Sequence, residues 1–357
     1  MSRVRAYTNY LKAPMAILTA LAYATTIDAE STSAPNWVEK AVIAAQANAC
    51  YTPSTIKTVA EIAYSLVSEK DSCVLVDKGD DQVGMLIAKS ILYSGESPVV
   101  VYVKTGQQTQ ASRRKTIVLR IVGGPAGSIA PSNIDEVYLA SLSVGDMLIS
   151  PGYSGTLYRS SYPNEDFSKA VKDVERYCVA LNQANPHAKI ILAGESLGGL
   201  IATVAMKGGC EPAVSGVVLL SPLITDPADA GRRVRQAMQR DGVTDPIKHV
   251  RLQTEQAGVR KPGRWASINS AELFEHFFSQ NQSHISAWSL LKSKTSKPVI
   301  LIYGVDDDRA GVNEIRKREL PESISVVAVV HMGHVPDPGA REVVAQAIQN
   351  FVQKTGR

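Results

Sequence analysis

The sequence predicts an α/β fold, in which helices flank a mostly parallel central sheet and a helical cap insertion interrupts the second half of the chain. Two observations predict it. From residue 71 onward, short apolar runs bounded by turn residues alternate with segments of helical spacing. The stretch 224–296 breaks this alternation, because it is charged, rich in glutamine and lacks a convincing long strand.

The first strands of the sheet are expected to be antiparallel, since residues 73–123 alternate strand-like runs with turns. Further along, residues 146–150 and 216–220 have the composition of buried strands, and residues 165–184 have the apolar spacing of a helix. This order of elements is the one that a large α/β domain requires.

A serine between glycines is the strongest signal for function. The motif Gly194-Glu195-Ser196-Leu197-Gly198 follows a strand-like run and precedes an apolar, helix-like one. Strand, sharp turn and helix form the context of a nucleophile elbow, where small residues flank a strained serine and the first helical amides point to the same place. We therefore predict Ser196 as a nucleophile. The alternative is an ordinary solvent-facing serine in a glycine-rich turn.

A serine hydroxyl needs a general base, and the base needs an orienting carboxylate. Residues 297–305 predict a buried strand, and Asp306, Asp307 and Asp308 follow it directly. The spacing from the glycine at the end of this strand favours Asp307 as the acid. Asp306 and Asp308 remain alternatives, and aspartates at this position could instead cap the next helix.

Two histidines follow the next predicted strand, residues 323–330. The Gly-His-x-Pro form favours His334 as the base, because the glycine lets the loop bring the ring over the serine. We expect His331, closer to the strand, to be packed or to have a supporting role, and it remains the alternative base. An H-x-x-H pair could also bind a metal, but no H-E-x-x-H motif or cysteine cluster accompanies it, so no metal site is expected.

A glycine-rich loop follows the predicted strand 115–121 and reads Val122-Gly123-Gly124-Pro125. Glycines let backbone amides approach a developing oxyanion closely. We expect Gly124 to supply one such amide and Leu197 the other, since a proline has no N–H to donate. The alternative is a plain loop. The predicted site thus consists of Ser196, Asp307 and His334 with these two amides, and it requires no cofactor.

Together these motifs resemble the α/β-hydrolase superfamily, in which the order along the chain is serine, acid, histidine. The stretches 123–125, 150–156 and 194–199 are most similar to the prolyl-oligopeptidase-like and proline-iminopeptidase-like branches. The resemblance implies a serine hydrolase that acts on ester or peptide bonds through an acyl-enzyme. Val122 stands where those branches carry a histidine or tyrosine, and Ser154 where they carry an arginine.

The expected function is hydrolysis of a carboxylic ester, or a related acyl bond, in a small to medium substrate. The alternatives are a serine peptidase of the aminopeptidase or prolyl-oligopeptidase-like type, acyl transfer to an alcohol or sugar, and a non-catalytic binding protein on the same fold. The expected partner is a small molecule or a peptide. Nucleic acid is not expected, because the net charge is only +4 and no basic tract is interleaved with aromatic residues.

Four regions are expected along the 357 residues. Residues 1–29 have the features of a signal peptide and residues 30–70 those of an N-terminal helical appendage. The core comprises residues 71–223 and 297–357, and the cap comprises residues 224–296. Aromatic residues of the cap either line a pocket over the serine or hold the cap together: Trp265, Phe274, Phe277, Phe278 and Trp288.

The N-terminus predicts export. Arg3, Arg5 and Lys12 precede an apolar run over residues 13–24, and small residues follow. The run is shorter than the roughly twenty residues that span a membrane. We therefore expect a secreted or periplasmic protein without stable membrane insertion after signal removal. A helical N-terminal arm or an uncleaved anchor is the alternative.

All four cysteines lie beyond this segment, at Cys50, Cys73, Cys178 and Cys210. An even number of cysteines in an exported chain permits two disulfides. Nearness in sequence favours Cys50 with Cys73 and Cys178 with Cys210. The other pairings and free buried thiols remain open.

Overall fold

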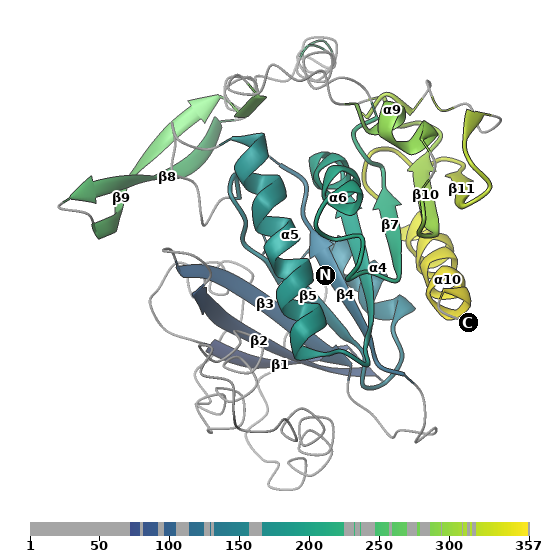
Figure 1. The fold of residues 1–357 in the computed structure, drawn as a ribbon, viewed down its shortest axis with the longest axis horizontal. Coiled ribbons are helices and arrows are strands. Elements are labelled where there is room, and N and C mark those ends of the chain that lie inside the picture. Colours follow the sequence, from purple (N-terminus) through teal and green to yellow (C-terminus); the bar gives the residue numbers. More distant parts are fainter. Residues whose placement is uncertain are drawn as a thin grey trace, which may run out of the picture.

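Figure 1 shows the fold in a computed structural model of the chain. The structure describes the following residues: 72–78, 81–91, 96–104, 114–124, 129, 132–156, 166–224, 232, 236, 247–256, 259–269, 277–278, 286–293, 295–308, 310–312, 315 and 319–355. The predicted signal (1–29) and helical appendage (30–70) lie outside these residues, as does Cys50.

A nine-stranded sheet forms the centre of the described structure, in the order β1-β2-β3-β5-β4-β6-β7-β10-β11. Its strands are β1 (Ser72–Lys78), β2 (Asp81–Ile91), β3 (Glu96–Lys104), β4 (Thr116–Ile121), β5 (Met147–Pro151), β6 (Lys189–Glu195), β7 (Gly216–Leu220), β10 (Val299–Gly304) and β11 (Ile324–Val329). Pairing from β1 through β3 to β5 is antiparallel, and pairing from β5 to β11 is parallel. The predicted antiparallel start and mostly parallel centre are confirmed.

The central strands are apolar because both faces of the sheet are covered. Every residue of β4, β5 and β7 is buried, as parallel strands packed on both sides require. Parallel pairing also aligns the carboxyl ends of β4, β6, β7, β10 and β11 along one edge. Loops that leave these strands therefore start side by side, which is where open α/β sheets bind ligands.

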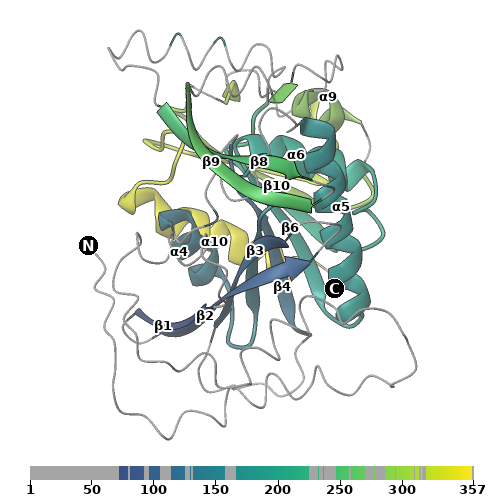
Figure 2. The same cartoon turned by 90° about the vertical axis from the view of Figure 1, so that its left-hand side faces the viewer.

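The helices form two layers, one on each face of the sheet (Figure 2). One layer contains α5 (Phe167–Ala184), α6 (Leu197–Lys207) and α9 (Ala287–Lys292), and the other contains α4 (Asn133–Ser141) and α10 (Pro338–Lys354). The helix predicted over 165–184 is confirmed as α5, and Asp166 caps it by accepting the amide of Lys169.

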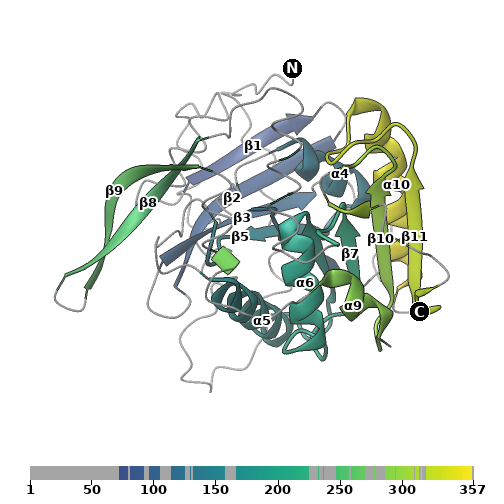
Figure 3. The same ribbon diagram turned by 90° about the horizontal axis from the view of Figure 1, so that it is seen from above.

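The insertion differs from the prediction. Instead of a purely helical cap, it contains a two-stranded antiparallel sheet of β8 (Ile247–Gln256) and β9 (Val259–Asn269). This hairpin projects away from the central sheet, to the left of α5 in Figure 1 and to the left of β2 and β3 in Figure 3. The sequence did not predict these strands, because the insertion is rich in charged and glutamine residues that favour helices. A register shift between Arg251 and Gln253 further interrupts any regular alternation.

Two aromatic residues of the insertion anchor it to the core. Phe277 is 1% exposed and packs edge to face against Phe167 at the start of α5, with 6.2 Å between ring centroids. Phe278 packs against both of these rings. A Cβ added at Gly155 would lie 2.5 Å from the Phe277 ring. The sequence analysis expected these aromatic residues either to line a pocket or to hold the cap together. The packing of Phe277 against Phe167 supports a structural role, in which it holds the insertion on the core.

One of the two favoured disulfides is present. Cys178 of α5 is bonded to Cys210, which follows α6, so the bridge joins two neighbouring helical segments. The side chain of Cys73 and the whole of Cys50 lie outside the described residues. No helix among the described residues is both long and apolar enough to cross a membrane.

We predict that the bridge stabilises the fold substantially. Replacing Cys178 and Cys210 together by alanine should lower the free energy of unfolding by about 2–4 kcal/mol, because the unfolded chain is no longer cross-linked. Thermal unfolding measures this, and a reductant should lower the Tm of the wild type more than that of the double variant. Reaction of both cysteines with a thiol reagent in unreduced, unfolded protein would contradict the pairing.

Candidate active site

Ser196 occupies the sharp turn between β6 and α6. Its backbone has φ 51° and ψ −124°, a region that residues with a Cβ rarely adopt. The turn is held by its own backbone, since the Ser196 amide donates to the Leu220 carbonyl and the Ser196 carbonyl accepts from Gly199 and Leu223. The strained serine of the predicted elbow is therefore fixed by bonds to β7 and to the residues that follow it.

The glycines of the motif are required by close packing. A Cβ on Gly198 would lie 2.2 Å from the Ile121 carbonyl oxygen and 2.4 Å from that of Val122. A Cβ on Gly194 would lie 2.4 Å from the Gly198 carbonyl oxygen. The end of β4 therefore touches the beginning of α6 directly, and this contact brings the glycine loop next to Ser196.

The structure brings the predicted serine, histidine and aspartate into one hydrogen-bonded row. Nε2 of His334 lies 2.9 Å from Oγ of Ser196, and Nδ1 of His334 lies 2.9 Å from Oδ2 of Asp307. The His334 side chain is 19% exposed, whereas that of Asp307 is fully buried. The imidazole ring is therefore partly exposed. Its Nε2 faces the serine hydroxyl, and its Nδ1 faces a carboxylate that is shielded from water.

Asp307 is set apart from its two neighbours by burial, because Asp306 and Asp308 are both exposed. The second oxygen of Asp307 accepts the amide of Ala310, three residues further on, although no α-helix lies between β10 and β11 among the described residues. His331 differs from the prediction: its side chain is 92% exposed, 4.0 Å from Asp306, rather than packed. Its positive φ of 60° turns the chain there as β11 ends.

The two predicted oxyanion donors belong to two segments that meet near the serine, the start of α6 and the loop after β4. Leu197 is the first residue of α6, so its N–H has no acceptor within the helix. Gly124 follows Gly123, whose position lies so close to Ser196 that an added Cβ would be 3.1 Å from the serine Cβ. The amide of Gly123 itself is engaged elsewhere, since it donates to Oε1 of Glu195 at 3.4 Å.

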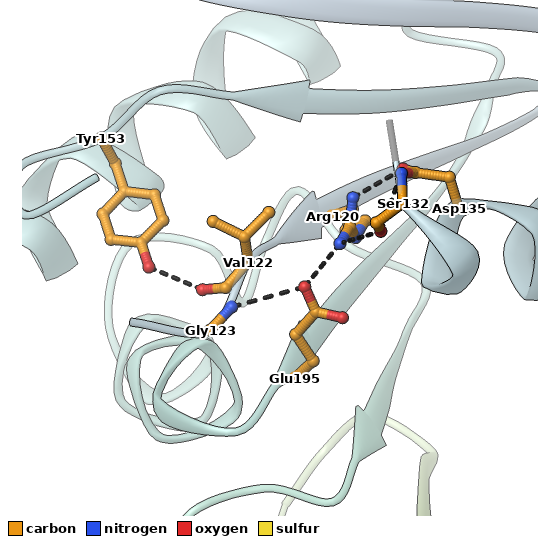
Figure 4. A network of polar contacts seen from close by, with 7 residues as sticks. All are labelled: Arg120, Val122, Gly123, Ser132, Asp135, Tyr153 and Glu195. Carbon is orange, nitrogen blue, oxygen red and sulfur yellow. Dashed lines mark hydrogen bonds and ion pairs between the residues drawn. The ribbon is translucent and has the colours of Figure 1, made fainter. Parts of the chain in front are cut away.

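Figure 4 shows a buried charge network beside this loop that the sequence analysis missed. Arg120 of β4 donates to Oδ1 of Asp135 and to Oε1 of Glu195, both at 2.6 Å, and to the hydroxyl of Ser132 at 3.3 Å. Asp135 in turn accepts the amide of Ser132, at the N-terminus of α4. An arginine in the middle of an apolar strand was the available signal, since a buried charge requires a partner.

The network perturbs the protonation of its members. Burial raises the pKa of Glu195, and the Arg120 guanidinium opposes that rise. Burial works against the charge of Arg120, but the carboxylates of Asp135 and Glu195 outweigh it and raise the pKa of Arg120. Arg120 therefore stays protonated and offsets the charge of the carboxylate next to Ser196. Within the described part of the chain, no group of three or more His, Cys, Asp or Glu residues could hold a metal ion.

Comparisons with known proteins concern the fold and a family match over part of the chain. The family described as serine aminopeptidase, S33, matches residues 154–308, a stretch that includes Ser196 and Asp307 and ends before His334. No curated protein matches the chain in sequence. Among solved structures, carboxyl esterase 2 from the mycorrhizal fungus Tuber melanosporum is similar with a TM-score of 0.53 and 12% identity, over 78% of this chain and 88% of that one.

Est1E from Butyrivibrio proteoclasticus, solved with bound ferulic acid, is similar with a TM-score of 0.51 and 15% identity, over 73% of this chain and 95% of that one. These similarities and the strand order show that the chain has the α/β-hydrolase fold. The superfamily resemblance seen in the sequence is confirmed at the level of the fold. The assignment to the prolyl-oligopeptidase-like and proline-iminopeptidase-like branches stays a prediction.

Replacing Gly198 by alanine should damage the site through packing. The added Cβ meets two backbone carbonyls that cannot rotate away, so we expect a loss of about 1–3 kcal/mol in the free energy of unfolding. Gly333→Ala is the matched control, because nothing lies within 4 Å of the added Cβ there and the free energy should change by less than about 0.5 kcal/mol. Chemical denaturation measures both, and equal stabilities would contradict the close contact.

Proposed function

We propose that this protein is a serine hydrolase that cleaves a carboxylic ester, or a related acyl bond, through a covalent acyl-enzyme. Oγ of Ser196 attacks the carbonyl carbon while Nε2 of His334 takes its proton. Asp307 accepts the Nδ1–H of His334, which fixes the tautomer and stabilises the charged imidazolium. The protonated His334 then gives its proton to the leaving group, and a water activated by the same ring releases the acyl group.

The observation that carries this proposal is the row of two 2.9 Å contacts from Asp307 through His334 to Ser196. A general base within hydrogen-bond reach of a strained serine, and itself oriented by a buried carboxylate, is the arrangement that activates a hydroxyl nucleophile. A non-catalytic binding protein would have no need for all three contacts. The amides of Gly124 and Leu197 would bind the oxyanion, each worth roughly 3 kcal/mol in the transition state.

A serine peptidase is the second candidate. The match to the serine aminopeptidase family over residues 154–308 favours it, whereas one of the two similar structures described above is a carboxyl esterase by its title. Esters react more readily than amides, because an alkoxide or phenolate leaves more easily than an amine. We therefore place ester hydrolysis first and use the ratio of ester to aminoacyl-amide turnover to decide.

We further propose that the enzyme acts after export, in a secreted or periplasmic location. The charged and apolar pattern of the N-terminus supports it, and so does the bond between Cys178 and Cys210. Disulfides form and persist in oxidising compartments and are rare in the cytosol of most organisms.

Ser196→Ala should fold like the wild type and lose turnover by at least about 10³-fold, because the attacking oxygen is gone. Hydrolysis of p-nitrophenyl esters of increasing acyl length and of aminoacyl p-nitroanilides measures the loss and separates the two candidates. A fluorophosphonate probe should label the wild type at Ser196 only. Labelling at another serine, or an active Ser196→Ala enzyme, would refute the assignment.

Asp307→Asn should lower kcat by about 10³–10⁴-fold, because an amide in place of the carboxylate favours the wrong imidazole tautomer. Asp306→Asn and Asp308→Asn are matched controls one residue away on exposed side chains, and each should change kcat by less than about twofold. The comparison uses kcat for one p-nitrophenyl ester. Equal losses in all three variants would leave the role of the buried carboxylate without support.

A further inference from the structure

The peptide group between Val122 and Gly123 is held at both ends. Its carbonyl oxygen, that of Val122, accepts the phenol O–H of Tyr153 at 2.6 Å. Its N–H, that of Gly123, donates to Oε1 of Glu195 at 3.4 Å. The oxygen and hydrogen of one trans peptide point in opposite directions, so Tyr153 and Glu195 grip it from opposite sides (Figure 4).

The two side chains that grip this peptide are themselves fixed. Tyr153 is 1% exposed, and burial raises the pKa of its phenol far above the usual value, so the group stays protonated and remains a donor. Oε1 of Glu195 also accepts from Arg120 at 2.6 Å, and Arg120 is bound on its other side by Asp135. The contact between Glu195 and this peptide is therefore connected, through Arg120 and Asp135, to the end of β4 and to the start of α4.

The gripped peptide lies directly against the elbow and directly before Gly124. The Val122 carbonyl oxygen would lie 2.4 Å from a Cβ on Gly198, and a Cβ on Gly123 would lie 3.1 Å from that of Ser196. Because the plane of one peptide constrains where the next begins, a fixed Val122–Gly123 peptide limits the directions in which the Gly124 N–H can point. The Gly123 N–H, already engaged by Glu195, is not aimed at a substrate.

We propose that Tyr153 and Glu195 are positioning residues that clamp the Val122–Gly123 peptide and thereby aim the Gly124 amide at the oxyanion. This inference rests on the proposed function and assigns to it two residues that do not touch the reacting atoms. A preorganised donor is effective because it needs no reorientation during the reaction. The two bonds to the Val122–Gly123 peptide fix the orientation of a loop whose glycines would otherwise allow many backbone conformations.

The decisive variant is Tyr153→Phe, which removes one O–H and keeps the ring in place. We expect kcat for p-nitrophenyl acetate to fall about 10-fold, less than the 10²–10³-fold cost of losing a donor outright. KM should stay within twofold. Inhibition by phenylboronic acid, whose tetrahedral serine adduct places an oxygen in the oxyanion site, should weaken by about the same 10-fold factor.

Tyr177→Phe is the matched control. Tyr177 is another fully buried tyrosine whose O–H donates to a backbone carbonyl, that of Gly152 at 2.9 Å, which precedes Tyr153 and is not part of the glycine loop itself. Both variants leave one buried carbonyl without its donor, so their Tm values should fall by similar amounts. Only Tyr153→Phe should change kcat and boronate inhibition. If the two variants behave alike in both, the clamp is refuted.

A second variant keeps the test decisive if circular dichroism shows that Tyr153→Phe does not fold. In Glu195→Leu the side chain has no oxygen, so it accepts from neither Arg120 nor Gly123 and the Gly123 N–H loses its acceptor. We expect a similar 10-fold loss in kcat with KM little changed, and an unchanged kcat would overturn the proposal. Wild-type protein that neither hydrolyses the ester nor reacts with fluorophosphonate would instead refute the proposed function itself.

Discussion

The site depends on how closely the end of β4 approaches the turn between β6 and α6. Gly198 lies against the carbonyl oxygens of Ile121 and Val122 so tightly that any side chain there would clash. This contact follows from the parallel pairing of β4 with β6, which brings both carboxyl ends to the same edge of the sheet. It puts a glycine loop and a strained serine within reach of each other before any catalytic side chain is considered.

A second constraint is electrostatic. The close approach buries Glu195 beside the serine, and an unpaired carboxylate there would disfavour a developing oxyanion. Arg120 offsets that charge and is itself balanced by Asp135, which lies at the start of α4. A buried ion network of this kind contributes little net stability on average, whereas breaking one of its contacts is costly. Its value here is geometric, because it holds the loop after β4 at fixed points.

The sequence predicted the parts of the site that local patterns encode. Strand, glycine-serine turn and helix follow one another within a few residues around Ser196, and Asp307 and His334 each follow an apolar strand directly. Only the structure shows that Asp307 is buried while Asp306 and Asp308 are exposed, because three adjacent aspartates follow the strand at nearly the same spacing. The bonds of Arg120 to Asp135 and Glu195 span 15 and 75 residues, so only the topology of the sheet reveals them. The strands β8 and β9 escaped prediction because polar residues on both faces give no alternation to read.

The most direct measurement is a crystal structure of the protein after reaction with a fluorophosphonate. We predict phosphorus bonded to Oγ of Ser196 and the phosphonyl oxygen within about 3 Å of the amides of Gly124 and Leu197. The Gly123 amide should still face Glu195, and the Val122 carbonyl should still accept from Tyr153. A phosphonyl oxygen bound instead by the Gly123 amide, or phosphorus on another residue, would contradict the account.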